Sequence, residues 1–263
     1  MRQLLPAASL VPGPRAESGL ADEVDPRLVY TADERPARPG RPWVVLNMIA
    51  SADGAIAVDG RSGPLGGPTD RAVFHGLRAI ADVILVGAET VRVERYGPHE
   101  PPATDQERRI ARGQPPIARF AVPSASLDFD PTAPFFTQAE VRPIVFCPTD
   151  AQPARRRRLA PVADVVPVGE GRVALDRALA ELWRRGARVV LCEGGPTLNG
   201  QLISLGLVDE LCFTVAPWLV SGTAGRAAHG EAPPDGPTRL RLDRLLEADG
   251  GYLFVRYVRD DGG

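Results

Sequence analysis

An acid, two glycines and a proline follow an apolar run, "ARVVLC", in the second half of the chain, where the stretch 193–200 reads "EGGPTLNG". Gly194 and Gly195 permit tight dihedral angles and leave backbone N–H groups uncovered, and Pro196 suits the first turn of a helix. Free amides at a helix N-terminus bind phosphate groups, so the turn predicts a cradle for a phosphate or pyrophosphate. A plain turn from strand to helix explains the spacing equally well. Glu193, which has little structural purpose at a strand's end, favours the ligand site.

A second polar turn is the Gly-rich stretch 47–71, between a buried-looking apolar run and a helical pattern. Asp53, Ser62 and Asp70 place polar groups near the end of that run. Arg78 is eight residues after Asp70 and so lies close to the same helix face, from which both could point into one cleft and Arg78 could bind an anionic substrate. Each has a structural alternative: Asp53 can cap its own turn, Asp70 can stabilise the first helical turn, and Arg78 can be solvated.

A third turn of the same type lies at 85–94, "LVGAETVRVE", where Thr90 falls in the first turn of a short helical pattern. Ligands of α/β sheets sit at the carboxyl ends of the strands, where helix N-termini point. Three turns of this kind in one sheet therefore predict a ligand cleft.

The elements that must position these turns alternate between apolar runs and helical patterns, which is typical of an α/β fold. Helices are expected at 69–81, 88–95, 151–160, 173–186 and 197–206. Strands are expected at 43–50, 82–87, 117–122, 143–147, 163–169 and 187–192 and, without helices between them, at 209–220, 238–249 and 252–258. The sheet is therefore expected to be mixed and mostly parallel, flanked by helices.

Two segments rich in proline fall outside this alternation. Residues 1–42 are expected to form an irregular arm, in which the short piece 27–33 could still pack on the body, and 43–263 are expected to form a single domain. The stretch 97–116 is long for a loop in a compact domain and is expected to be either functional or mobile.

Composition excludes several classes of function. The 263-residue chain has a formal net charge of −2, so no nucleic-acid surface is expected. All 31 basic residues are arginine, which excludes a Schiff-base lysine and a lysine-bearing phosphate loop. Cys147, Cys192 and Cys212 stand alone in apolar runs, so we expect no disulfide framework, no metal site and a cytoplasmic protein. No run approaches the ~20 apolar residues of a membrane span, and no signal peptide is expected.

Three blocks, "NMIASADGAIA", "ADVILVGAETV" and "EGGPTLNGQLISLGLVDEL" with the following "APWLVSG", resemble in sequence and order the reductase domain of bacterial riboflavin biosynthesis. The resemblance runs from Trp43 to Val258. It implies a dihydrofolate-reductase-like fold, NADPH as cofactor, a homodimer, and a small heterocyclic substrate. The implied reaction is hydride transfer from nicotinamide C4 to a pyrimidine phosphate, whose ribosylamino group becomes ribitylamino.

The resemblance also implies roles for individual residues. Glu193 matches the family's substrate-contacting acid, and Asp53, Ser62 and Arg78 fall on the substrate side. The cofactor side comprises Ile49, Pro64, Thr90, Glu94 and the phosphate loop of Gly194, Gly195, Pro196, Thr197, Leu198, Asn199, Gly200 and Gln201, with Ser124 as the candidate for the 2′-phosphate.

The chain departs from the family in two places. The zinc deaminase domain that often precedes the reductase has no counterpart in residues 1–42, so a stand-alone reductase is expected. After Thr90, where relatives carry an arginine for the substrate phosphate, the sequence is "VERYGPHEPP", and Arg95 or another loop arginine is the candidate substitute.

Two alternatives stay open. The first is a reductase of dihydrofolate or another pterin-like heterocycle, in which Asp70 would be the catalytic acid at the ring edge. The second is a protein that binds NADP(H) without catalysis.

Overall fold

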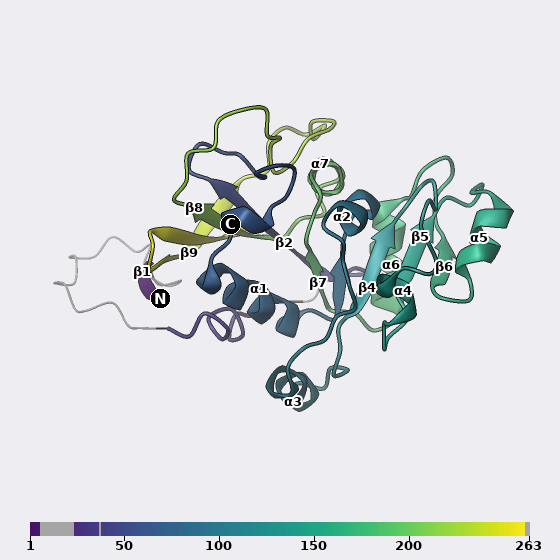
Figure 1. Ribbon diagram of the computed structural model, residues 1–263, viewed down its shortest axis with the longest axis horizontal. Coiled ribbons are helices and arrows are strands. Elements are labelled where there is room, and N and C mark those ends of the chain that lie inside the picture. The colour runs from purple at the N-terminus through teal and green to yellow at the C-terminus, as the bar shows by residue number, and fades with distance from the viewer. Residues whose placement is uncertain (6–23, 37, 261–263) are drawn as a thin grey trace.

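The computed structural model describes residues 1–5, 24–36 and 38–260 (Figure 1). They contain a ten-stranded sheet with the order β1-β9-β10-β8-β2-β7-β3-β4-β5-β6. All neighbours from β8 to β6 pair in parallel, whereas β10 is antiparallel to β8 and β9, and β1 is antiparallel to β9. The predicted mixed, mostly parallel sheet is confirmed.

The strands are β1 (Arg2–Leu5), β2 (Trp43–Ser51), β3 (Val83–Leu85), β4 (Arg119–Pro123), β5 (Ile144–Cys147), β6 (Asp164–Pro167), β7 (Val189–Cys192), β8 (Glu210–Ala216), β9 (Leu240–Ala248) and β10 (Tyr252–Arg259). The helices are the 3-10 helix η1 (Gly63–Leu65) and α1 (Pro68–Ile80), α2 (Ala88–Val93), α3 (Ala103–Ala111), α4 (Pro134–Thr137), α5 (Pro153–Leu159), α6 (Leu175–Arg184) and α7 (Pro196–Ser204). Every strand and helix expected from residue 43 onward is present, with bounds that differ by a few residues.

Helices cover both faces of the sheet, and β2 shows why its sequence is apolar without alternation. Val44 and Leu46 pack with α6 and α7 on one face. Trp43 and Val45 pack with α1 on the other, where α4 and α5 continue the layer over β4 and β5. A central parallel strand is buried on both sides, so both sets of side chains are apolar. Figure 1 shows α1 and α7 on opposite sides of β2 and β7.

The described residues between 24 and 42 form no named helix or strand, as expected of an irregular segment, and the piece 27–33 packs on the body; only Arg2–Leu5 departs from the expectation, since it forms a strand. Strand β1 pairs with β9 at the edge of the sheet. Tyr30 is 2% exposed and belongs to the core beneath α1. Composition does not reveal these contacts, because a few buried side chains, such as Tyr30 and Arg35, are enough to hold a proline-rich segment against the sheet. Residues 6–23, which carry the rest of that expectation, lie outside the described residues.

The loop expected at 97–116 contains helix α3, which closes the end of α1. Arg109 is fully buried, and its Nη1 donates to the carbonyls of Ala79 and Ala81 at 3.2 and 2.5 Å. Arg112 Nη2 also donates to Ala79, at 2.6 Å. The last carbonyls of a helix have no partner within it, and cationic donors there satisfy them and suit the helix dipole. The segment therefore has a structural role.

Candidate active site

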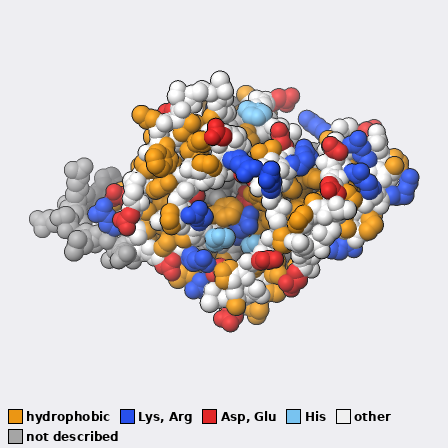
Figure 2. Space-filling view, in the orientation of Figure 1, with side chains coloured by type: hydrophobic (Ala, Val, Ile, Leu, Met, Phe, Trp, Pro, Cys, Tyr) orange, Lys and Arg blue, Asp and Glu red, His pale blue; other side chains and the backbone are white. Residues whose placement is uncertain are grey.

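A cavity of about 1050 Å³ opens at the carboxyl ends of β2, β7, β3 and β4, between the N-termini of α1, α2 and α7. Figure 2 shows it as a hollow near the middle of the displayed face, with basic side chains around it. This is the edge at which the three turns were expected to meet. Drug-sized ligands occupy cavities of roughly 300–1,000 Å³, so this one is at the large end of that range.

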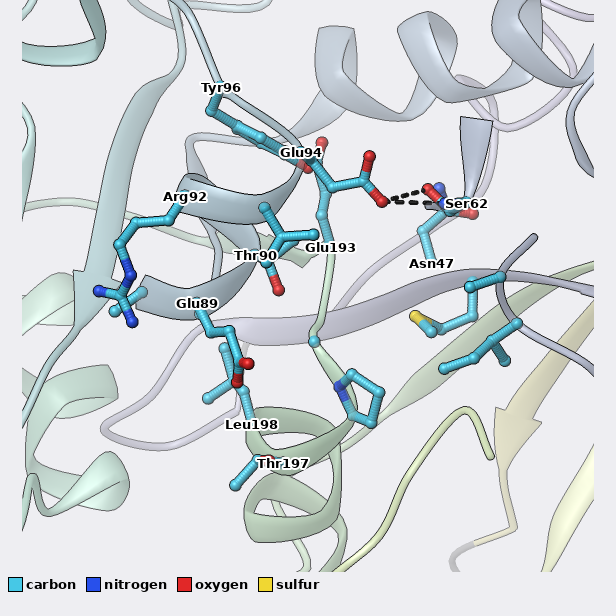
Figure 3. Close-up of a pocket in the computed structure, with 18 of the residues that line it drawn as sticks. Asn47, Ser62, Glu89, Thr90, Arg92, Glu94, Tyr96, Glu193, Thr197 and Leu198 are labelled. Atoms are coloured by element: carbon cyan, nitrogen blue, oxygen red, sulfur yellow. Dashed lines mark hydrogen bonds between the residues drawn. The ribbon is translucent and has the colours of Figure 1, made fainter. Parts of the chain in front are cut away.

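Two of the turns pack directly against each other. Gly87 N, before α2, donates to Gly194 O at 2.7 Å. A Cβ on Gly195 would lie 2.7 Å from Thr90 Oγ1, so glycine is required at that contact. Gly194 has a φ of 83°, in the left-handed region that favours glycine, and the Gly194–Gly195 peptide bond is cis. These glycines place the first turn of α7 beside that of α2 (Figure 3).

The first turn of α7 lines the cavity. Gly195 is the N-cap residue, Pro196 begins the helix, and Thr197, Leu198 and Gln201 also face the cavity. The first amides of a helix have no partner within it, so they are free to bind an anion. This cradle of glycine, proline and uncovered amides fits a dinucleotide pyrophosphate.

Three other residues of the expected phosphate loop lie behind the cavity. Asn199 is fully buried, and its Nδ2 donates to Ala227 O at 2.7 Å. Gly200 lies so close to the next segment that a Cβ would meet His229 O at 2.0 Å. Gly194 is likewise absent from the cavity wall. Asn199 and Gly200 pack the chain around 227–229 against α7, and none of the three residues lines the cavity.

Glu193 and Arg78 form a buried ion pair in the cavity wall. Arg78 Nε lies 2.6 Å from Glu193 Oε1, and Nη2 lies 2.8 Å from Oε2. The Tyr96 hydroxyl donates to the same Oε2 at 2.8 Å. The side chain of Arg78 is 13% exposed and that of Glu193 is 2% exposed. The sequence predicted that both residues line one site, but not that they form an ion pair with each other. The expectation that Glu193 has little structural purpose is wrong.

Aromatic rings surround this pair. The Arg78 guanidinium carbon lies 4.3 Å from the ring centre of Phe74 and 5.6 Å from that of Tyr96. Burial lowers the pKa of Arg78, but the Glu193 carboxylate outweighs it and the net shift is upward. Burial and the same carboxylate raise the pKa of Tyr96 well above its usual value. The site therefore holds a charged arginine and a neutral tyrosine hydroxyl at neutral pH.

Ser62 and Glu94 join the loop after β2 to α2. Glu94 Oε1 accepts hydrogen bonds from Ser62 N at 2.9 Å and from Ser62 Oγ at 3.0 Å, as Figure 3 shows. Both residues line the cavity, as does Ile49 on β2, whereas Pro64 in η1 does not. The bond closes the loop over the site.

Asp53, expected on the substrate side, lies outside the cavity wall, so that expectation is wrong. Its carboxylate accepts hydrogen bonds from Ser51 Oγ at 2.5 Å and from the backbone of Val220 and Ser221. The Ser51 bond, followed by the backbone bonds, lowers the pKa of Asp53 to about 2. Asp53 therefore binds the start of the long β8–β9 connection. Its carboxylate caps backbone N–H groups as in a turn, but in a distant segment of the chain and not in its own turn.

Asp70 lines the cavity near β2 and β8. Its carboxylate accepts a hydrogen bond from the Thr214 hydroxyl on β8. Burial raises the pKa of Asp70 despite that bond and the nearby charge of Arg71. Asp70 is in the first turn of α1, as expected, but it also presents a carboxylate to the site.

The other end of the cavity is reached by the turns after β4 and β6. Ser124 lines it, and its Oγ accepts a hydrogen bond from Leu127 N at 3.0 Å. Arg172, in the turn "GEGR" after β6, also lines it, and no ion pair of Arg172 occurs among the described residues. The four consecutive arginines at 155–158, on α5, do not line the cavity. Arg155 and Arg158 donate hydrogen bonds to the carbonyls of Ser126 and Phe129.

Sequence reasoning missed Phe74, Tyr96 and Arg172. Tyr96 and Phe74 carry no spacing signal, because an aromatic residue beside a helix is usually part of the core. Arg172 had one: it follows a predicted strand in a Gly-rich turn, as the recognised site residues do. Arg95, suggested as a phosphate ligand, is exposed and is not part of the cavity wall.

Comparisons with known proteins identify the family. A family model described as the RibD C-terminal domain matches residues 42–254. The 2,5-diamino-6-ribosylamino-4(3H)-pyrimidinone 5′-phosphate reductase of Methanothermobacter thermautotrophicus is 32% identical over 222 residues, which cover 83% of this chain and 98% of the relative. The enzyme of the same name from Archaeoglobus fulgidus is 33% identical over 183 residues, 69% of this chain and 83% of the relative.

The fold is shared with solved structures. A pyrimidine reductase-like protein from Corynebacterium diphtheriae superposes with a TM-score of 0.77 at 29% identity, over 91% of this chain and 100% of that one. Within the described residues, none of the helices is both long and apolar enough to cross a membrane. The chain resembles these reductases along most of its length, and the family model matches residues 42–254. Both findings agree with the cavity that the three predicted turns form. The chain belongs to the RibD C-terminal domain family and is an oxidoreductase of the riboflavin-biosynthesis type.

Proposed function

We propose that the protein uses NADPH to reduce the ribosylamino group of a pyrimidine 5′-phosphate to ribitylamino. One observation carries the proposal: an anion-binding helix start, that of α7, and a buried ion pair, Glu193 with Arg78, line the same cavity. Relatives named as reductases of a ribosylamino-pyrimidinone phosphate support the choice of substrate class.

The residues present fit a nicotinamide dinucleotide. The uncovered amides of Thr197 and Leu198 would hold the pyrophosphate, and the contact between Gly195 and Thr90 leaves no side chain in its way. When bound, the cofactor supplies a hydride from nicotinamide C4. The polypeptide's part is to fix the two reactants against each other and to exclude water, which lowers the entropic cost of the encounter.

On the substrate side, Glu193 would accept hydrogen bonds from the ribosyl hydroxyl groups while Arg78 and Tyr96 fix its orientation. Reduction of the open-chain imine adds hydride to C1′ and a proton to the attached nitrogen. Because Arg78 is buried and paired, its role is to position the carboxylate. A cytoplasmic homodimer is part of the proposal on the strength of the family resemblance.

The direct test follows NADPH oxidation with the ribosylamino-pyrimidine phosphate and dihydrofolate side by side. Turnover with the pyrimidine alone is expected. Turnover with dihydrofolate alone would replace this proposal by the pterin reading. Binding of NADPH without turnover of either compound would leave the second alternative, a protein that binds the cofactor without catalysis.

NADPH is expected to raise the melting temperature. A ligand at 100 times its Kd stabilises by about 2.7 kcal/mol, which in a domain of this size corresponds to roughly 5–10 °C. NADH at the same concentration is expected to give a smaller shift. Differential scanning fluorimetry over a concentration series measures both, and the absence of any shift at millimolar NADPH would refute the cofactor assignment.

Arg172 is the residue we expect to contact the 2′-phosphate, since it lines the β6 end of the cavity without an ion pair among the described residues. Arg172→Ala should raise the Kd for NADPH by roughly tenfold or more, the scale of a charge-assisted hydrogen bond, and leave the Kd for NADH unchanged. Arg177→Ala is the matched control, because Arg177 is exposed on α6 and does not line the cavity. Equal loss for both cofactors would contradict this role.

A further inference from the structure

The carboxylate of Asp70 is an acceptor without a matching cation in the substrate half of the cavity. It lines the cavity and forms no salt bridge with any described residue; its hydrogen bond comes from the neutral hydroxyl of Thr214. Arg71 is adjacent in sequence but makes no ion pair with it in the described part of the chain. A partly buried carboxylate retains unused acceptor capacity in such a setting, because each oxygen can accept two hydrogen bonds.

The backbone around Asp70 is built to hold this group in place. A Cβ on Gly66 would lie 2.7 Å from Asp70 Oδ2, so the loop after η1 passes directly over the carboxylate. Gly66 has an ordinary extended conformation, with φ −79° and ψ 148°, so a side chain there would strain no backbone angle but would push the Asp70 carboxylate aside. The loop and Thr214 therefore lie on two sides of the carboxylate and limit how far it can move.

The spacing of Asp70 and Arg78 along α1 is close to the length of the proposed substrate. Asp70 and Arg78 are eight residues apart on α1, so they are separated by about 12 Å along the helix axis and by about 80° around it, and both line the cavity. A pyrimidine ring with its open ribosyl chain is of comparable length. A substrate whose sugar meets Glu193 would therefore place its ring toward Asp70.

The two pyrimidines that such a reductase could receive differ at the edge that a carboxylate reads. A 2-amino-4(3H)-pyrimidinone offers two adjacent donors, the 2-amino group and N3–H, which match the two oxygens of a carboxylate. The deaminated uracil offers N3–H between two carbonyl oxygens, so one carboxylate oxygen would face an acceptor. Paired donors to a carboxylate are strong and directional, and an unmatched acceptor in a buried site is costly.

We propose that Asp70 is a specificity-determining residue, which recognises the 2-amino and N3–H groups of the substrate and makes the protein prefer a 2,5-diamino-pyrimidinone phosphate to its deaminated uracil counterpart. This rests on the proposed function. A favourable interaction of Asp70 with the dipole of α1 is also present, but it would not distinguish the two compounds.

The test compares kcat/KM for the two phosphates in the wild type and in Asp70→Asn. The wild type should favour the diamino compound by about tenfold or more. In Asp70→Asn the amide oxygen still accepts from N3–H while its NH₂ group donates to the uracil carbonyl, so the ratio should fall by at least about tenfold, toward or past equality. Gly66→Ala, which displaces the carboxylate without changing charge, should weaken the preference in the same direction.

Asp176→Asn is the matched control, because Asp176 is also the acid in the first turn of its helix, α6, and does not line the cavity. It should leave the ratio unchanged. NADPH-induced thermal shifts confirm that each variant is folded. Equal use of both phosphates by the wild type, or an unchanged ratio in both cavity variants, would overturn the role of Asp70 while the proposed function stands. Failure of the wild type to reduce either phosphate would overturn the proposed function and this inference with it.

Discussion

Replacing Glu193 with glutamine is expected to lower kcat/KM for the pyrimidine phosphate by about tenfold or more and to destabilise the fold. The kinetic loss reflects one charge-assisted hydrogen bond to the substrate, about 1.5–3 kcal/mol. The loss of stability arises because Arg78, 13% exposed, would keep its charge without a carboxylate. Breaking a buried pair by removing one partner costs about 3–5 kcal/mol, and the amide that remains should keep the effect toward the lower end. Steady-state kinetics and chemical denaturation measure the two effects.

Two further variants separate the contributions. Tyr96→Phe removes one donor to Glu193 Oε2 but leaves both contacts with Arg78, so it should cost about 1 kcal/mol of stability and little activity. The double variant Arg78→Gln with Glu193→Gln removes both charges and should recover part of the stability without recovering turnover. Wild-type kinetics in a folded Glu193→Gln protein would limit this carboxylate to a structural role.

The sequence predicted the position of the site because glycine turns and apolar runs are local signals. Gly194, Gly195 and Pro196 restrict the backbone wherever they stand, and the strands before the turns are apolar on both faces. The edge of the sheet at which the turns meet then follows from parallel pairing. None of this required knowledge of side-chain contacts.

Pairing between distant side chains could not be predicted in the same way. Glu193 and Arg78 are 115 residues apart, and each alone looks like a free functional group. Asp53 looks like a site residue until Val220 and Ser221, from a distant segment, donate to it. Helix α3 was missed because its role depends on buried Arg109 reaching the end of α1, while its composition is that of a polar loop.

The contact that anchors the N-terminal segment could not be predicted for a related reason. Arg35 lies in a stretch rich in proline and charge, yet its side chain is 5% exposed. Its Nε and Nη2 donate to Glu210 on β8 at 3.0 and 2.8 Å. The anchor is a charge buried against a charge, a contact that composition cannot reveal.

Glu210 is expected to be the most important single charge for stability in this part of the protein. It is fully buried and accepts hydrogen bonds from Arg35, from Arg256 Nε at 2.9 Å, and from Trp43 Nε1 at 3.0 Å. Burial alone would raise its pKa, but the two arginines outweigh burial and lower it to about 2. Glu210→Gln should therefore destabilise the protein by about 3–5 kcal/mol, since it leaves two buried guanidinium groups short of one negative charge.

The control is Glu247→Gln. The Glu247 carboxylate pairs with an exposed arginine, Arg2, so this substitution should change stability by less than about 1 kcal/mol. The pH dependence gives a second measure. The pKa of Glu210 in the folded state lies below its ordinary value of 4.5, so its contribution is fully present above pH ~4.5 and is lost as the pH falls toward 2. The difference in unfolding free energy between wild type and Glu210→Gln should therefore shrink across that interval. A difference that stays constant from pH 6 to pH 3 would mean that shape and hydrogen bonding at Glu210, and not its charge, hold the N-terminal segment to the sheet.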